Sequence, residues 1–396
     1  MATSAELHDL IDRNRLVSRT AEMVRIPSVN PFARAALDSP APTGDEGEAK
    51  IGEWYESQLR HLGYETTTQD VVAGRPNVSG IGPGGDGPVL ALVGHLDTVG
   101  VTGYEDPFSG RIENGRVYGR GACDMKGALA CFLEVAEVLA ATGHKLHGRL
   151  MIVGLADEEF GMLGSQRFDT PHPIDWAIVG EPTDLYICNA HLGQYAFTVR
   201  TTGRAVHSSV ANQGVNAIEA MAKIVGIIPN YRDELANGVR HPVCGTGTVN
   251  AGVIRGGDMV SIVPDLCEME IDRRLVPGED SSTVRAEFAS RLHVLGTGDD
   301  QFRWEFGDVL VDSLPLDTPE SSTIVDAAQR AAGSFSSPSE SVAFPAATDA
   351  PNLGVPAIVW GPGSLRQAHT VDEYVEADDL VTASHLYLET VLRLLS

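Results

Sequence analysis

Cysteine is scarce in this sequence, and no two cysteines form a C-x-x-C pair. The five cysteines stand at positions 123, 131, 188, 244 and 267, an odd number at wide spacing. This pattern argues against a disulfide framework. We therefore expect reduced thiols in a cytoplasmic protein, with Cys123 a packing residue and not a metal ligand.

Positive charge and long apolar runs are also lacking. Lys and Arg number 29 against 54 Asp and Glu, which gives a formal net charge of −25. Nucleic acid and anionic membranes both require a positive protein surface, so neither is an expected partner. The sequence contains no run of about 18 apolar residues, which is the length needed to span a membrane. The N-terminal stretch MATSAELHDLIDRNRL carries charges throughout, unlike a signal peptide or an anchor.

A sound nucleotide-binding motif is missing too. Gly80, Gly82 and Gly85 match G-x-G-x-x-G, but Pro83 interrupts the match. A strand also follows it, where a dinucleotide site requires a helix. We interpret this segment as a hairpin turn.

The sequence does contain alternating helix and strand patterns, and its 396 residues suggest two or three domains. Helices are predicted over about 6–26, ended by Pro27, and over 47–61, with a strand over 64–72. Alternation through Glu181 indicates an α/β domain with a mixed, largely parallel sheet and helices on both faces.

A different order begins near Ala190. The patterns predict strand 194–202, a helix from 217, strands 248–256 and 268–276, helix 281–295 and strand 301–307. This β-α-β-β-α-β order is typical of a ferredoxin-like α+β domain. Since the α/β pattern then resumes, we predict a catalytic domain over 1–188 and 307–396, interrupted by an inserted domain over 189–306.

The apolar run from Leu90 to Val99 is the strongest strand signal, and it is interrupted by His95 and Asp97. Such a run is typical of a strand buried on both faces, and ligands bind at the carboxyl ends of parallel strands. Residues two apart on a strand point the same way. Asp97 can therefore bind one ring nitrogen of His95 and fix the orientation of the ring, while the other ring nitrogen binds a metal.

Acidic and imidazole side chains also follow other predicted strands along the chain. They are Asp124 in GRGACDMKG, Glu158 and Glu159 after LMIVGLA, Glu181 after WAIVG, and His369 beyond PAIVW. Two histidines and four acids in one cleft suit zinc, cobalt or manganese.

The motifs GHLDTV, GRGACDMKG, DEE, GEPT and the late histidine resemble the M20 metallopeptidase family over nearly the whole chain. Within that family, GEPTDL, AHLG, HSS, GVNAIEAM and GPGSLRQAHTVDEY look most like the acetylornithine deacetylases. The resemblance implies a metal-dependent amidohydrolase that removes an N-acyl group from an amino acid, with N2-acetyl-L-ornithine, an arginine precursor, as first candidate. Succinyl-diaminopimelate, other N-acyl amino acids and peptides stay open as substrates, as does a non-catalytic metal-binding scaffold.

The resemblance also implies two divalent metal ions, zinc first, with cobalt or manganese as alternatives. His95, Asp124 and Glu181 look like the ligands of one ion, and Asp124, Glu159 and His369 like those of the other. Asp124 would bridge both ions, because each carboxylate oxygen can face one cation. Asp97 would orient His95.

The remaining roles come from the same resemblance. Neighbours on an extended backbone point in different directions, so Glu158 and Glu159 cannot share a role. Glu158 resembles the general base that takes a proton from the attacking water. His207 resembles the residue that stabilises the oxyanion, commonly from the partner subunit of a homodimer, and the inserted domain would then serve as lid and dimerisation domain.

Three further positions resemble substrate contacts, namely Asn250, Arg274 and Gly363, the last in the loop Gly361 to Gly363. Arg274 suits a bidentate grip on a carboxylate. Arg273 could take that part instead, since strand alternation allows only one of the two arginines to face the cleft.

Overall fold

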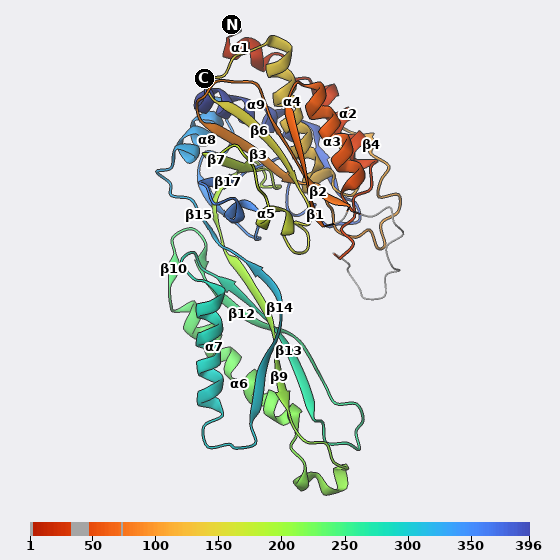
Figure 1. Ribbon diagram of the computed structural model, residues 1–396, viewed down its shortest axis with the longest axis vertical. Coiled ribbons are helices and arrows are strands. Elements are labelled where there is room, and N and C mark those ends of the chain that lie inside the picture. The colour runs from red at the N-terminus through yellow and green to blue at the C-terminus, as the bar shows by residue number, and fades with distance from the viewer. Residues whose placement is uncertain (1–2, 33–46, 73) are drawn as a thin grey trace. The chain divides into compact units, whose positions relative to one another are not determined.

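The computed structural model describes residues 3–32, 47–72 and 74–396, which form two compact units (Figure 1). The first unit consists of Met1–Asn189, Thr318–Val342 and Thr348–Ser396, and the second of Ala190–Asp317 and Ala343–Ala347. The predicted boundary at 306 falls inside strand β14, Arg303–Ser313. The chain therefore leaves the second unit later than the sequence pattern indicated, because this strand is longer than its apolar part.

The first unit is built on a sheet whose central strands are parallel. Its strand order is β1-β2-β6-β3-β7-β17-β8, with β16 also paired to β8. Strands β6, β3, β7 and β17 run parallel, and β1, β2 and β8 are antiparallel to their neighbours. The bounds are β1 Glu65–Val72, β2 Arg75–Ile81, β3 Val89–His95, β6 Arg149–Leu155, β7 Trp176–Val179, β8 Ile187–His191, β16 Ser341–Phe344 and β17 Ala357–Val359. Every residue of β3 is buried, as its continuous apolar pattern predicted.

Helices pack against this sheet around one large apolar core. Their bounds are α1 Ser4–His8, α2 Arg13–Val24, α3 Ala49–His61, α4 Gly127–Thr142, α5 Leu163–Gln166, α8 Thr323–Ser334 and α9 Ala377–Leu395, with the short turns η1 Ala122–Lys126 and η3 Ala350–Leu353. Helix α4 is buried along most of its length, because apolar or small side chains cover most of its surface. The predicted α/β class with a largely parallel sheet is confirmed. In the described part of the chain, no helix has both the length and the apolar character needed to cross a membrane.

A small three-stranded sheet in the same unit brings the C-terminal region beside the glycine-rich turn that carries Asp124. Its order is β18-β5-β4, with bounds β4 Arg111–Glu113, β5 Arg116–Tyr118 and β18 Tyr374–Glu376. Tyr374 pairs with Tyr118, three residues before the turn that begins at Gly121. Residues near 373 thus lie next to residues near 121.

The second unit contains a four-stranded antiparallel sheet of order β12-β13-β9-β14. Its elements are β9 Gly193–Thr202, η2 Ser208–Gln213, α6 Ala217–Ala236, β10 Arg240–His241, β11 Gly245–Thr246, β12 Thr248–Gly256, β13 Leu266–Leu275, α7 Ser281–Leu295, β14 and β15 Leu316–Asp317. Apart from the short β10-β11 hairpin, this is the predicted β-α-β-β-α-β order. An apolar core of its own lies between the sheet and the two long helices.

Two local predictions are wrong. The segment 6–26 is not one helix, because Asp12 caps a new helix, accepting hydrogen bonds from the backbone of Asn14 and Arg15. The glycines between β2 and β3 do not form a hairpin turn either, because β6 lies between these two strands. A Cβ atom at Gly84 or Gly85 would collide with the backbone that leads into β6, so close backbone approach explains the glycines there.

Candidate metal centre

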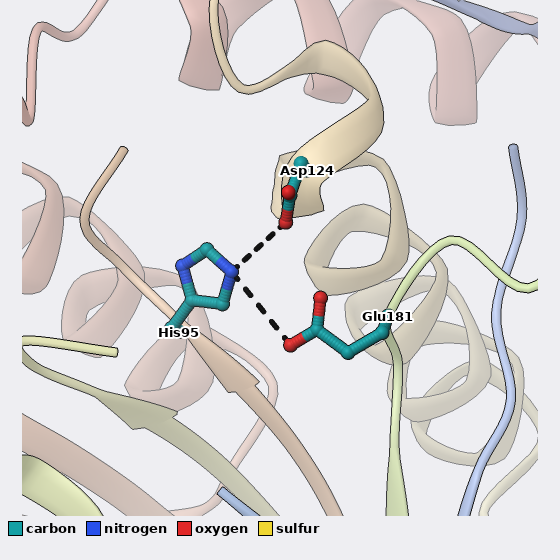
Figure 2. A group of neighbouring side chains, drawn as sticks. All are labelled: His95, Asp124 and Glu181. Carbon is teal, nitrogen blue, oxygen red and sulfur yellow. Dashed lines mark hydrogen bonds and ion pairs between the residues drawn. The ribbon is translucent and has the colours of Figure 1, made fainter. Parts of the chain in front are cut away.

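His95 ends β3 with one ring nitrogen held by the chain and the other turned towards carboxylates (Figure 2). Its Nδ1 lies 3.0 Å from the carbonyl oxygen of Asp97 and 3.6 Å from the Asp97 carboxylate. A carbonyl oxygen only accepts, so Nδ1 must be the donor. The free Nε2 lies 3.0 Å from Oδ1 of Asp124 and 3.7 Å from Oε1 of Glu181. The local geometry therefore leaves Nε2 available as a ligand atom, although the main contact of Nδ1 is the backbone oxygen of Asp97 and not the side chain that the His-x-Asp spacing indicated.

Asp124 is held by Glu373, a buried residue that the small sheet brings to it. The Glu373 carboxylate accepts hydrogen bonds from the backbone nitrogens of Gly121, Cys123 and Asp124, at 3.1, 2.9 and 3.1 Å. It also pairs with Arg120 at 2.5 Å. These contacts fix the turn that points Asp124 towards His95.

Asp124 also faces a second histidine. While Oδ1 faces His95, Oδ2 lies 3.3 Å from Nε2 of His369. The same His369 nitrogen lies 3.1 Å from Oε2 of Glu159. The other oxygen of Glu159 accepts a hydrogen bond from the backbone nitrogen of Val99 at 3.2 Å.

The side chains therefore form two groups that share Asp124. In each group, one ligand atom from every residue lies within 4.8 Å of the others: His95, Asp124 and Glu181 form one group, and Asp124, Glu159 and His369 the other. The residues are the same as in the two ligand sets that the resemblance to the M20 family implied. They come from the ends of β3, β6 and β7, from the turn before α4, and from the loop after β17.

The electrostatics of the cluster match a site for cations. Burial opposes charge on His95, but Glu181, Asp124 and Asp97 outweigh it and raise the pKa of the imidazole well above its ordinary value. Hydrogen bonds that His369 donates to Asp124 and Glu159 raise the pKa of its imidazole to about 10. Burial raises the pKa of Glu181 well above its usual range. The positive charge of His95 acts in the opposite direction and offsets only part of this shift. Burial therefore disfavours the charged form of Glu181 unless a further cation lies beside it.

One buried oxygen of the cluster also lacks a hydrogen-bond partner among the described residues. Oε1 of Glu181 accepts no hydrogen bond from the residues that the structure describes. A buried carboxylate oxygen in this state is costly, and a bound cation would remove the cost. Together with the mixture of imidazole and carboxylate donors, this oxygen makes the cluster a fitting site for zinc or a related divalent ion.

Glu158 and Glu159 lie in the turn after β6, not on an extended backbone, and their carboxylates have different surroundings. The Asp97 carboxylate accepts hydrogen bonds from both of their backbone nitrogens, at 3.1 Å each. Glu159 reaches the second ligand group, whereas Glu158 belongs to neither. Burial and then the negative charge of Glu181 raise the pKa of Glu158 well above its usual range. A carboxyl group with a raised pKa beside such a cluster is suited to proton transfer.

Comparison with known proteins identifies the family. The sequence profile described as "Peptidase family M20/M25/M40" matches residues 91–393. The chain belongs to this peptidase family. It is 32% identical over 362 residues to a protein named acetylornithine deacetylase from Vibrio parahaemolyticus, covering 88% of this chain and 92% of that one. It is also 32% identical to the protein of the same name from Pasteurella multocida, covering 90% and 95% of the two chains.

Solved structures agree on the fold. A tripeptidase from Staphylococcus aureus superposes with a TM-score of 0.78 at 20% identity, covering 97% of this chain and 99% of that chain. A Bacillus subtilis protein, described as a dinuclear metal binding peptidase from the M20 family, gives 0.70 at 17% identity, covering 96% and 97%. As a member of this peptidase family, the protein is a metal-dependent hydrolase.

The other predicted site residues of this M20 protein lie outside the cluster. His207, Asn250 and Arg274 are in the second unit. Gly363 is in the first unit, with φ of 83°, and a Cβ atom there would press on Sγ of Cys123. Cys123 itself is buried and donates to the carbonyl oxygen of Ser364 at 3.3 Å. The five cysteines are all free thiols.

The two neighbouring arginines of β13 have different surroundings. Arg273 is buried in the core of the second unit, where it pairs with Glu279 at 2.6 Å. Arg274 points to the other face and pairs with Asp272 at 3.1 Å. Asn250 is paired across the strands with Asp272, so it shares that face with Arg274. Arg273 is therefore committed to the core, and Arg274 is the more accessible of the two.

Sequence reasoning in this M20 chain missed several acids near the cluster. Glu373 lies in HTVDEY, only four residues after His369, and its position in that motif was the available signal. Asp349 is buried and belongs to neither ligand group. Burial raises the pKa of its carboxyl group to about 7, although a hydrogen bond from Ser165 acts in the opposite direction. No sequence signal distinguishes Asp349 from a surface acid.

Proposed function

We propose that this protein is a binuclear metal amidohydrolase that removes the N-acyl group from an amino acid, with N2-acetyl-L-ornithine as its substrate. The observation that carries the proposal is the pair of ligand groups that share Asp124, next to a Glu158 that belongs to neither. The two relatives named acetylornithine deacetylase support the choice of substrate. The net charge of −25 also favours a substrate with a cationic side chain over an additional carboxylate.

We propose zinc as the natural metal, with cobalt or manganese as alternatives. His95, Asp124 and Glu181 would hold one ion, and Asp124, Glu159 and His369 the other. The two ions would polarise the scissile carbonyl and lower the pKa of the attacking water. Asp97 would serve them indirectly by holding the His95 ring and the backbone of Glu158 and Glu159.

The protein's own groups would move the protons. Glu158 would take a proton from the attacking water and return it to the nitrogen of the leaving amine, so that the amide bond breaks without releasing an amide anion. A raised pKa suits this double role, because the same group must accept and then donate.

His207 would stabilise the negative charge that develops on the carbonyl oxygen. Its Nδ1 accepts a hydrogen bond from the backbone nitrogen of Ser209 at 3.2 Å, which leaves Nε2 as the protonated nitrogen. His207 is exposed, so this donor is available. We further propose that Arg274 grips the substrate carboxylate and that Asn250 and Gly363 contact the substrate.

A substrate panel tests the proposed reaction. N-acetyl and N-succinyl amino acids and dipeptides are incubated with protein loaded with zinc or cobalt, and free amine is measured. We expect N2-acetyl-L-ornithine to be cleaved fastest, with activity abolished by a chelator and restored by added metal. Faster cleavage of succinyl-diaminopimelate or of a dipeptide would replace the proposed substrate. Complete inactivity with bound metal would favour a metal-binding scaffold, and full activity without metal would refute the binuclear mechanism.

We also propose that the protein is a homodimer in which His207 acts in the partner's active site. The second unit exposes a cluster of apolar side chains, with Met259, Val260 and Ile262 exposed by 62, 99 and 41%. An exposed apolar patch of this kind marks an interaction surface.

Mixing two inactive variants tests this arrangement. His207→Ala lacks the oxyanion donor, and Asp124→Asn lacks the shared ligand. If His207 acts in the partner's site, a mixed dimer has one complete site, and up to about a quarter of wild-type activity should return on subunit exchange. Activity is measured after exchange has been verified by mass or fluorescence. The absence of recovery in verified mixed dimers would show that His207 does not act across the interface.

A further inference from the structure

A buried chain of polar and charged side chains lies behind the candidate metal centre. We call it the Arg75 relay, and it consists of Asn30, Glu48, Arg75, Asp97 and Asp157. Their exposed fractions are 0, 0, 5, 1 and 1%. Charged side chains are seldom buried this deeply, and a buried ion pair is often no more stabilising than apolar residues of the same size. Their burial therefore calls for an explanation beyond stability.

Arg75 lies at the first position of β2, and its guanidinium faces two buried carboxylates. Its Nε and Nη2 donate to the two carboxylate oxygens of Glu48 at 2.7 and 2.6 Å. Its Nη1 forms an ion pair with Oδ1 of Asp157 at 2.8 Å. The bidentate pair with Glu48 is specific to arginine, because a lysine ammonium cannot present two donors in a fixed plane.

Asn30 links Asp157 to Asp97. Its side-chain nitrogen donates to Oδ1 of Asp157 at 3.0 Å and to Oδ2 of Asp97 at 2.7 Å. Asp97 in turn accepts the backbone hydrogen bonds of Glu158 and Glu159. An unbroken series of contacts thus leads from Arg75 to the proposed base and to a proposed metal ligand.

Asp157 also sets the direction of the turn. Its φ of 68° is in the left-handed region, which aspartate adopts only at a cost. The conformation is held from several sides, since its backbone nitrogen donates to Glu48 at 3.0 Å and its carbonyl oxygen accepts from Gly161 at 3.1 Å. Glu48 and Arg75 together therefore fix the residue from which Glu158 and Glu159 project.

We propose that Arg75 is a positioning residue for the hydrolytic site. Through Glu48, Asp157, Asn30 and Asp97 it holds the turn that carries Glu158 and Glu159, and with it the ring of His95. The inference rests on the proposed function for its effect on turnover, but its effect on metal affinity requires only that the cluster binds metal.

The test compares Arg75→Lys with Arg15→Lys. Arg15 forms an equivalent fork with the fully buried Glu134, at 2.7 and 2.6 Å, between α2 and α4. Both variants lose a bidentate pair and keep the charge, so both should lower the melting temperature. We expect Arg75→Lys alone to weaken zinc affinity, measured by competition with a chromogenic chelator, and to lower kcat at saturating zinc, each by about 10- to 100-fold, with KM little changed.

Asn30→Ala provides a second variant in case Arg75→Lys does not fold. It removes the amide between the two aspartates without leaving an unpaired cation, and we expect it to weaken zinc affinity and kcat in the same direction. The proposal is overturned if the folded relay variants match Arg15→Lys, with lowered melting temperature but zinc affinity and kcat within twofold of wild type. If wild-type protein binds zinc yet cleaves no N-acyl amino acid, the proposed function fails, while the affinity comparison still decides the role of Arg75.

Discussion

Replacing Glu158 by Gln should leave both metal ions bound and lower turnover by a factor on the order of 10² to 10⁴. The substitution keeps the size of the side chain but removes the carboxylate that we propose as the proton acceptor. Metal content should not change, because Glu158 is in neither ligand group. Metal is measured by elemental analysis beside kcat, and substrate binding by calorimetry should persist.

Glu159→Gln is the matched control, since the two residues are neighbours with the same carboxyl group. Here an anionic ligand becomes a weaker neutral amide oxygen, so occupancy of one metal should fall and excess metal should partly restore activity. If Glu158→Gln loses metal and Glu159→Gln keeps both ions, the two roles are reversed. If neither variant affects turnover, the acidic pair is only a surface turn.

Asp124→Asn should have the other large effect, because Asp124 is the one residue present in both ligand groups. Its two oxygens face His95 and His369 separately. An amide offers one good ligand oxygen and no charge, so both ions should bind weakly. A catalytic metal ion supplies several kcal/mol of transition-state stabilisation. Activity should therefore fall on the order of 10³-fold, at about 1.4 kcal/mol per factor of ten.

Glu181→Gln separates this bridging role from a general loss of charge. This substitution also removes one negative charge, but Glu181 belongs to one ligand group only. We therefore expect about one metal ion per chain to remain after dialysis. Elemental analysis of both variants gives the answer. If Asp124→Asn and Glu181→Gln each retain one ion, Asp124 does not bridge.

One shared cleft could be predicted from the sequence because the topology brings the strand ends together, whereas the division of its residues into two ligand groups came from the family resemblance. Strands β3, β6 and β7 are parallel neighbours, so residues that follow their carboxyl ends meet at one edge of the sheet. An apolar run followed by His95, Glu159 or Glu181 is visible in the sequence. The family resemblance then distinguished Glu159 from Glu158, which the strand pattern alone could not do.

The supporting residues could not be predicted in the same way. Glu48, Arg75 and Glu373 lie in polar stretches, where charged residues are ordinarily exposed. Their burial depends on partners far away in the sequence, such as Glu373 with the turn near Gly121. The false hairpin has a similar cause. The glycines signalled a tight approach of the backbone, but not which strand it approaches.

Because His369 lies far along the chain from the other ligand residues, the proposed metal ions would connect segments that are distant in the sequence. The ligands before the second unit end at Glu181, and the last ligand follows only after the chain has returned from that unit. The ion held by Glu159 and His369 would therefore act as a cross-link that closes a loop containing slightly more than half of the sequence. Closing so long a loop removes much conformational freedom from the unfolded chain. Metal binding would thus couple the folding of the C-terminal segment to that of the N-terminal strands. This coupling would not depend on the folding of the second unit.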